Sequence, residues 1–373
     1  MLPPFCPYKS CVHHHDRKPC GRPWYRKRGW YTTVQGKRVQ RFQCLSCRRS
    51  FSTRTFSIDY FTHKHLVYQR ILTHLSSCSG IRDIARDMKV SPSTILNRIS
   101  RLARQTIAVH HELSMQLKLG ESLVADGFES YAVSQYFPNN IHLLAGKDSQ
   151  FWYASDYAHL RRKKAMGEWQ NSRNAVMQGC FSSGRVTVYV SFSRIMEAVE
   201  RLQSSSGEHQ VKLYTDTHPQ YQRVIEDRDE KERFGVVHQR VCSRLTRSMH
   251  NPLFAVNYLD RQIRKDCAEH VRETVKYARN VSNSMERLAI YRFCHNYMKP
   301  YRVGQKRYVG VSHGMMAGIR KEAIEEQKRT VFSQRRFLSR TGGLSFSEAL
   351  VWLRGIATPL KRYAEHLPAY AWQ

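Results

Sequence analysis

The stretch Ser122-Leu-Val-Ala-Asp-Gly-Phe128 decides the fold, because it is an apolar strand pattern that runs out in an acid and a glycine. Apolar runs at residues 140–145 and 150–154 follow, with turn residues between them, so we expect three successive strands. Further along, the pattern predicts a polar helix at 161–174, a short strand at 186–190, a helix at 193–203, a strand at 211–215, a short helix near 219–226, a strand at 234–241 and long helices over 251–294. This order predicts an α/β fold, with a mixed sheet covered by helices.

Asp126 and Asp216 each stand where a predicted strand ends, and strand ends are where sites collect in an α/β sheet. Two carboxylates that lie side by side repel each other, so such a pair typically binds divalent cations. The alternative for each residue is an aspartate that caps a turn, which is the commoner role of a single aspartate after a strand. The strand order favours a pair that binds Mg²⁺ or Mn²⁺.

A third acidic ligand is expected from a helix packed against the same edge of the sheet. Asp260 is our first choice, because it lies on a helix predicted to begin near Pro252. An exposed helix also carries acids that only pair with its own Lys and Arg residues, so alternatives stay open. These alternatives are Asp266, Glu269, Glu273 and Glu286.

Five of the ten cysteines fall within the first 47 residues, which indicates a metal site. Cys6 and Cys11 form one pair, Cys44 and Cys47 form the other, and four thiolates suit one tetrahedral zinc ion. The first pair is wider than usual, so alternative ligands near it are His13, His14, His15 and Cys20. The cysteines scattered singly are expected to be small core residues: Cys78, Cys180, Cys242, Cys267 and Cys294.

A helix-turn-helix is predicted at residues 81–102, after a helix at 64–76. Ser91 is a good N-cap for the second helix, and Pro92 suits its first position. Lys89 stands where the turn often has glycine. The residues expected to face outward and to contact DNA are Ser93, Thr94, Asn97, Arg98 and Arg101. The alternative is an ordinary helical hairpin within a core, and residues 103–118 are expected to form a linking helix.

The charge of the chain indicates a polyanionic partner. Its 373 residues carry 61 Lys and Arg against 30 Asp and Glu, a formal net charge of +31. Double-stranded DNA is the favoured partner, ahead of a ribosomal or membrane-surface role, because no basic amphipathic anchor stands out. Neither a signal peptide nor a membrane span is apparent, so we expect a cytoplasmic, nucleoid-associated protein.

Together these motifs resemble those of bacterial insertion-sequence transposases of the DDE type. The residues that carry the resemblance are Cys44-Leu-Ser-Cys47 leading into Phe51-Ser52, the helix pair at 81–102, Ala125-Asp-Gly127, Tyr214-Thr-Asp-Thr-His218, Asp260-Arg-Gln-Ile-Arg264, Arg272-Glu-Thr274 and His295-Asn-Tyr297. In that family the third acid stands on a helix ahead of an Asn-containing motif, an order that favours Asp260 over Glu286. Family members more often have glutamate at this position.

The resemblance implies a domain order and a chemistry. It implies a zinc ribbon at residues 1–60, a helix-turn-helix domain with its linking helix at 61–118, an RNase H-like catalytic domain at 119–300 and a basic C-terminal region at 301–373. It implies Mg²⁺ held by Asp126, Asp216 and Asp260, DNA strand cleavage and strand transfer, and a homodimer or larger assembly on DNA. His218 and His238 are expected near the acids, where they either orient water or phosphate or serve only the structure.

Two other functions compete with transposition. One is a non-catalytic DNA-binding regulator derived from a transposase, and the other is a nuclease that only cleaves. The acids at positions 126 and 216 argue against the regulator.

Overall fold

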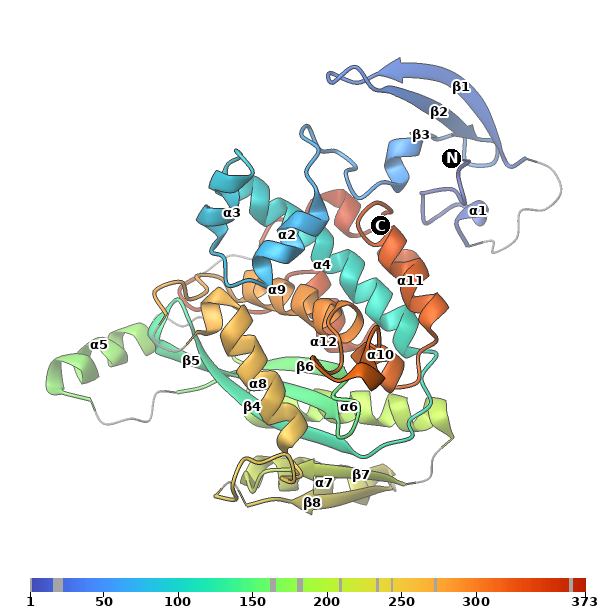
Figure 1. Cartoon of the computed structure of the whole chain (residues 1–373). Coiled ribbons are helices and arrows are strands. Elements are labelled where there is room, and N and C mark those ends of the chain that lie inside the picture. Colours follow the sequence, from blue (N-terminus) through green and yellow to red (C-terminus); the bar gives the residue numbers. More distant parts are fainter. Residues whose placement is uncertain are drawn as a thin grey trace.

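The computed structural model describes the chain apart from residues 1, 16–22, 162–165, 180–183, 208–209, 233–234, 243, 272–273 and 362–364. Cys20, Cys180 and Glu273 therefore lie outside the described residues. A central sheet is packed against helices, and a small second sheet lies at one end of the molecule near the N-terminus (Figure 1). Within the described part of the chain, no helix is both long and apolar enough to cross a membrane.

The central sheet has five strands. They are β4 (Leu123–Ala132), β5 (Ser134–Gly146), β6 (Trp152–His159), β7 (Val211–Thr215) and β8 (Val236–Arg240), arranged in the order β6-β5-β4-β7-β8. The first three strands along the chain pair antiparallel, whereas β7 runs parallel to both β4 and β8. The mixed sheet predicted from the sequence is confirmed.

Helices cover both faces of this sheet. They include α6 (Val188–Ser206), α7 (Pro219–Glu232), α8 (Phe254–Asp266) and α9 (Val281–Phe293). Successive residues of a strand point to opposite faces. Ala125 of β4 accordingly belongs to an apolar cluster with Phe192 of α6, whereas Val124 belongs to another with Leu259 of α8. The sheet thus separates α6 and α7 from α8.

The helical segment before the sheet contains α2 (Tyr68–Leu75), α3 (Ile81–Asp87) and α4 (Pro92–Ser114). Lys89, in the turn between α3 and α4, has a φ of +52°, the left-handed conformation that explains why glycine is common there. The side chain of Ser91 accepts a hydrogen bond from the Thr94 amide and caps α4. α4 is 23 residues long, so the predicted second helix and linking helix form one continuous element.

The small sheet contains β1 (Tyr25–Thr32), β2 (Arg38–Cys44) and β3 (Ser50–Ser52), all antiparallel. A cluster of aromatic residues fills its inner side, and this cluster includes Phe42, Phe51 and Phe56. Phe337 also belongs to the cluster, so a distant segment of the chain closes this small core. The short helices α1 (Val12–His15) and η1 (Thr53–Phe56) flank the sheet.

One local prediction is wrong. Residues 186–190 do not form a strand, because the Thr187 side chain accepts a hydrogen bond from the Val190 amide and thereby begins α6. The polar helix predicted at 161–174 is confirmed in part by α5 (Glu168–Gly179), whereas residues 162–165 lie outside the described residues. α5 projects from the body of the molecule (Figure 1) and has no buried residue.

The C-terminal region packs along the whole molecule. It contains α10 (His313–Met316), α11 (Lys321–Thr330) and α12 (Phe346–Trp352). Ile324 joins the cluster that holds Ala125, Trp352 joins the one that holds Val124, and Phe337 joins the aromatic cluster of the small sheet. Residues 301–373 therefore contribute to all three apolar clusters.

Candidate active site and metal centre

The register of two parallel strands brings Asp126 and Asp216 to the same level. β4 and β7 pair at Leu123–Leu213 and at Val124–Tyr214. Asp126 lies two residues beyond Val124, and Asp216 lies two residues beyond Tyr214. β4 and β7 stop pairing at this level. The sheet therefore opens between these two strands, and both acids lie beside the opening.

Asp126, Asp216 and Asp260 line one pocket of about 300 Å³. β4 supplies the first acid, the end of β7 the second and α8 the third. The pocket is also lined by Gly127, Glu129, Asn140, His218, Tyr221, Cys242, Leu245, Arg247, Asn251, Leu253, Asn257 and Arg264. The three acids predicted from the sequence therefore meet in one cavity.

The electrostatics of Asp126 reflect this crowding of carboxylates. The pKa of Asp126 is raised to about 7, chiefly by burial and also by the nearby Asp216 and Asp260, whereas the Gly127 amide and Arg247 oppose the shift. The Gly127 amide donates to Asp126 Oδ1 at 2.7 Å. A cation bound between these carboxylates would offset both the burial of the charge and the repulsion between the acids, and would thereby lower the pKa of Asp126.

The backbone after β7 fixes Asp216 and His218. The His218 amide donates to Asp216 Oδ1 at 2.9 Å. This hydrogen bond closes a tight turn and fixes the orientation of the Asp216 side chain. His218 lines the pocket as expected. His238 differs, because its Nε2 lies 2.8 Å from the Thr215 hydroxyl and the residue is not part of the pocket lining. Burial lowers the pKa of His238, which indicates a structural role.

The alternatives to Asp260 are engaged in ion pairs and hydrogen bonds away from this pocket. Glu269 pairs with Arg287 at 2.5 Å, and Glu286 pairs with Arg354 at 2.5 Å. Asp266 accepts a hydrogen bond from the Tyr291 hydroxyl at 2.6 Å and pairs with Lys299. Among the described acids proposed for the third position, Asp260 alone lines the pocket.

Arginines surround Asp260. Arg264 Nε donates to Asp260 Oδ1 at 2.8 Å, and Arg264 also donates to the Glu129 carbonyl at 3.0 Å. Arg247, Arg261 and Arg264 line an adjoining recess of about 340 Å³ that shares Asp260 with the pocket. Guanidinium groups bind phosphate oxygens well, so the recess suits a phosphate chain that runs past the acids.

The oxygen-rich lining fits Mg²⁺ or Mn²⁺, which prefer carboxylate, amide and water oxygens. The carboxylates are, however, less tightly gathered than the cysteines described below. Within the described residues, only that cysteine group brings three or more His, Cys, Asp or Glu ligand atoms within 4.8 Å of one another. Direct binding of one ion by all three acids would therefore require a shift of side chains, including release of Asp260 from Arg264.

Sequence reasoning missed Asn140 and Tyr221, which belong to the same pocket. Asn140 Oδ1 is buried and lacks a hydrogen-bond partner within the described part of the chain. Burial raises the pKa of Tyr221 well above its usual range, and nearby Asp126 and Asp216 add to the effect. Neither residue belongs to a recognisable motif: Asn140 reaches the pocket from β5, the strand paired with β4, and Tyr221 reaches it from the first turn of α7.

Gly127 is the feature of the sequence that could have indicated a close neighbour such as Asn140. A Cβ atom at position 127 would collide with the side-chain amide of Asn140. The glycine after Asp126 thus leaves the space through which Asn140 reaches the pocket.

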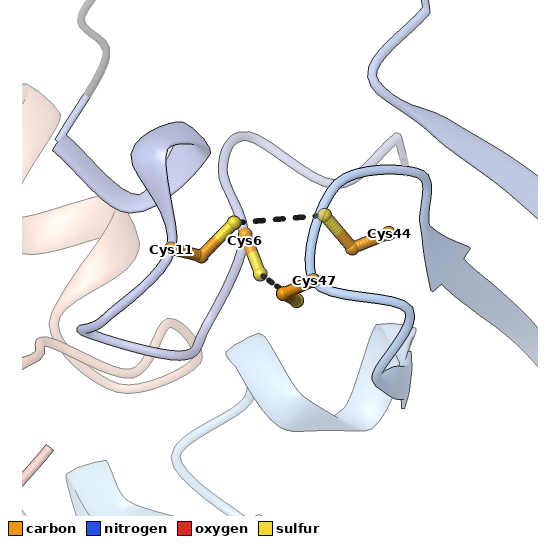
Figure 2. Close-up of side chains that lie close together, drawn as sticks. All are labelled: Cys6, Cys11, Cys44 and Cys47. Carbon is orange, nitrogen blue, oxygen red and sulfur yellow. Dashed lines mark hydrogen bonds between the residues drawn. The ribbon is translucent and has the colours of Figure 1, made fainter.

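The four predicted cysteine ligands lie close together (Figure 2). Cys6 and Cys11 come from the segment before α1, and Cys44 and Cys47 come from the end of β2 and the turn that follows it. The Cys6 and Cys47 sulfurs lie 3.7 Å apart, and those of Cys11 and Cys44 lie 3.6 Å apart. All four sulfurs lie within 4.8 Å of one another, so the group can hold a metal ion such as zinc. Burial raises the pKa of the Cys6 thiol far above its usual range, so a bound cation would be needed to stabilise its thiolate.

The histidines that competed with these cysteines are engaged elsewhere. His13 lies 2.8 Å from the Ser46 hydroxyl, His14 lies 2.7 Å from the Cys6 carbonyl, and His15 lies 2.9 Å from the Lys9 carbonyl. Of the scattered cysteines, Cys267 and Cys294 are buried as expected, whereas Cys242 is exposed and lines the acidic pocket. The core prediction is thus wrong for Cys242.

The predicted outward face of α4 needs a correction. Ser93 and Asn97 are exposed and Thr94 is half-buried, but Arg98 and Arg101 are buried. Arg98 donates to the Lys64 carbonyl at 2.7 Å, and Arg101 donates to the Ile58 carbonyl at 2.9 Å. These two arginines face the segment that precedes α2. They bind its backbone carbonyl groups and are not exposed to solvent.

The His295-Asn-Tyr297 motif is part of the protein core. Asn296 exchanges two hydrogen bonds of 2.9 Å with the backbone of Trp152 at the start of β6. His295 lies 2.9 Å from the Gln150 carbonyl, and the Tyr297 hydroxyl lies 3.0 Å from His110. The motif therefore fixes the turn between β5 and β6 to the end of α9.

Comparison with known proteins adds no relative. No protein-family model matches the chain, and no curated protein matches it.

Proposed function

We propose that the chain is a DDE-type DNA transposase of an insertion sequence, which binds element ends and catalyses metal-dependent strand cleavage and strand transfer. The observation that carries the proposal is the convergence of Asp126, Asp216 and Asp260 in one pocket, next to an arginine-lined recess. The strand order β6-β5-β4-β7-β8 supports an RNase H-like catalytic domain. The acids would hold Mg²⁺ or Mn²⁺.

The residues of the pocket divide the work between metal and phosphate. Asp126 and Asp216 stand at the same level of the sheet and would share a cation, while Asp260 would complete the ligand set from α8. Bound divalent cations would activate a water or a DNA 3′-hydroxyl as the nucleophile and stabilise the leaving oxygen. Arg247 and Arg261 would bind phosphates on either side of the scissile bond, and His218 would orient water or phosphate.

Arg264 has a further part in this proposal, because it now neutralises Asp260. A DNA phosphate in the recess would compete for the guanidinium of Arg264 and free the Asp260 carboxylate. Substrate binding and completion of the metal site would then be coupled.

The front of the chain would select the DNA. Zinc held by Cys6, Cys11, Cys44 and Cys47 would fix the small sheet, and the exposed Ser93 and Asn97 of α4 would contact bases. The net charge of +31 supports strong, salt-dependent binding to DNA. Strand transfer must hold two DNA ends together, so a homodimer or larger assembly is part of the proposal.

The test incubates the protein with labelled element ends, a target plasmid and Mg²⁺. Strand-joined product is the expected result, cleavage alone would support a nuclease, and binding without either would support a regulator. Asp126→Asn and Asp216→Asn should each abolish cleavage and weaken Mn²⁺ binding measured by electron paramagnetic resonance. Glu325→Gln, on the surface of α11, is the matched control and should change neither. Full activity in the Asp126→Asn/Asp216→Asn double variant would overturn the proposal.

A further inference from the structure

The hairpin formed by β1 and β2, together with the residues that follow it, carries charge of one sign only. Residues 23–58 contain nine Lys and Arg residues and no Asp or Glu, whereas the whole chain has about one acid for every two bases. The exposed cations of the hairpin are Arg26, Lys27, Arg28, Lys37, Arg38 and Arg41. Without acids nearby, their charges are not neutralised within the hairpin.

The hairpin is held at its base, and most residues of β1 beyond this base are exposed. Cys44 ends β2 within the cysteine group, and Phe42 lies in the aromatic cluster beneath it. Beyond this base the strands arch over the loop that precedes α2, and the hairpin turn lies next to that loop (Figure 1). A β-bulge at Gly29, with a φ of +69°, curves β1, and Gln40 Nε2 donates to the Gly29 carbonyl at 2.6 Å to fix it.

One loop connects the hairpin to the N-terminal half of α4. Gln35, in the hairpin turn, donates to the His63 carbonyl at 2.6 Å. Arg98 of α4 donates to the neighbouring Lys64 carbonyl at 2.7 Å. The hairpin turn and α4 are thus held against adjacent residues of the same loop, so they form parts of one surface.

The position of the hairpin beside α4 matters for DNA binding because Arg98 and Arg101 of α4 are buried. The sequence suggested that these two arginines would contact DNA, but both bind backbone carbonyls inside the protein. The exposed residues at the start of α4, Ser93 and Asn97, are uncharged. Phosphate contacts beside them need cations from another element, and the hairpin supplies such cations.

We propose that the β1–β2 hairpin binds the sugar-phosphate backbone of duplex DNA alongside the N-terminal half of α4. This inference rests on the proposed function and deepens it by assigning non-specific affinity to the hairpin. A two-stranded ribbon has dimensions that fit the major groove of duplex DNA.

The aromatic residues of the hairpin favour a duplex over a single strand. The Arg38 guanidinium lies 5.1 Å from the centre of the Trp30 ring, and the Arg41 guanidinium lies 5.0 Å from that of Tyr31. Single-strand binding uses ring faces for base stacking, and here a guanidinium already covers one face of each ring. The hairpin therefore presents mainly cations.

The test measures binding of the full-length protein to a random-sequence duplex by fluorescence anisotropy over a range of salt concentrations. In the triple variant Lys27→Gln/Arg28→Gln/Lys37→Gln, the negative slope of log K against log salt should become shallower by about 3, since each phosphate contact contributes about one. Affinity at low salt should fall on the order of tenfold or more. The matched control, Lys118→Gln/Lys321→Gln/Lys306→Gln, removes the same charge from other exposed sites and should change the slope by less than about one.

The outcomes separate this inference from the proposed function. If the wild-type protein binds duplex and the hairpin variant keeps its slope, the hairpin inference is overturned while the proposed function stands. If the wild-type protein does not bind duplex at all, both are overturned. Tighter binding to single-stranded DNA or RNA than to duplex would also overturn the hairpin inference. An unchanged thermal unfolding curve of the triple variant, expected for exposed sites, shows that the loss is one of binding.

Discussion

At the scale of single residues, Asp126 links pH to both stability and metal binding. Its folded pKa of about 7 lies above the value near 3.9 of an aspartate in an unfolded chain. The stabilising effect of the retained proton is therefore fully present below about pH 4 and is lost as the pH rises through about 7.

We therefore expect the unfolding free energy of the metal-free protein to fall, by on the order of 1–2 kcal/mol, between about pH 4 and pH 7, a figure discounted because the carboxyl faces the pocket. Urea denaturation at several pH values measures this fall. In Asp126→Asn the fall should be smaller. Mn²⁺ affinity of the wild-type protein should rise over the same range, because the cation displaces the proton. A wild-type protein and variant with identical pH profiles would contradict the pKa assignment.

A second prediction concerns the space beside Asp126. Gly127→Ala places a methyl group where the Asn140 amide now lies, so Asn140 must leave the pocket. We expect a destabilisation of about 1–3 kcal/mol in urea denaturation, together with weaker Mn²⁺ binding. Gly120→Ala is the matched control, because a Cβ atom there meets no neighbour within 4 Å and should leave both measurements nearly unchanged. Equal behaviour of the two variants would show that Asn140 is not held by the glycine.

At the scale of elements, α4 combines a buried face with an exposed face that we propose to contact DNA. Arg101 contacts the Ile58 carbonyl and lies 4.4 Å from the centre of the Tyr370 ring, so it connects segments from both ends of the chain. Ser93, on the same helix, is exposed. The two residues should therefore respond differently to substitution.

We expect Arg101→Gln to lower the unfolding free energy by about 1–3 kcal/mol, because a buried carbonyl loses its charged donor. Ser93→Ala should leave stability within about 0.5 kcal/mol of wild type but change the preference among DNA sequences. Denaturation and competitive binding to a pool of duplexes measure the two effects. A stable Arg101→Gln protein with altered sequence preference would reverse the roles assigned here.

The elements that the sequence predicted well are those whose pattern is local. The strands around residues 123–128 and 211–215 are apolar runs with turn residues beside them, and Ser91 marks the start of α4 unambiguously. The strand predicted at residues 186–190 was wrong. The β-branched residues of this segment suit a strand, but Thr187 caps the start of a helix there. Asp216 follows the end of β7 as the sequence predicted, but the prediction is wrong for Asp126, which lies within β4 at the level where β4 stops pairing with β7. The place of Asn140 and the burial of Arg98 depend on contacts between separate elements, which carry no local pattern.

At the scale of the whole molecule, the cysteine group and the C-terminal region share one small core. Phe337 packs in the aromatic cluster next to Cys6 and Cys44, and Arg340 donates to the His14 carbonyl. A metal ion held by these cysteines would therefore stabilise the small sheet, whereas the central sheet has its own apolar clusters.

We expect removal of the metal by a chelator to loosen the small sheet and to leave the central sheet folded. Limited proteolysis should then cleave first within residues 23–58, and duplex binding should weaken while Mn²⁺ binding at the acids persists. The Cys44→Ser variant should behave like the chelated protein, and Cys294→Ser, which alters a buried cysteine outside the group, is the control. Cooperative loss of the entire fold on chelation would contradict this separation.

Residues 368–373 return to the interior of the molecule. The Trp352 indole donates to the Ala371 carbonyl at 2.9 Å, and the Leu338 amide donates to the Gln373 carbonyl at 2.7 Å. A chain cut before residue 371 would leave both donors without these acceptors, and such a loss costs stability where the donors are buried. Shortening the chain by only three residues would therefore weaken the attachment of α12 and of the segment that packs against the small sheet.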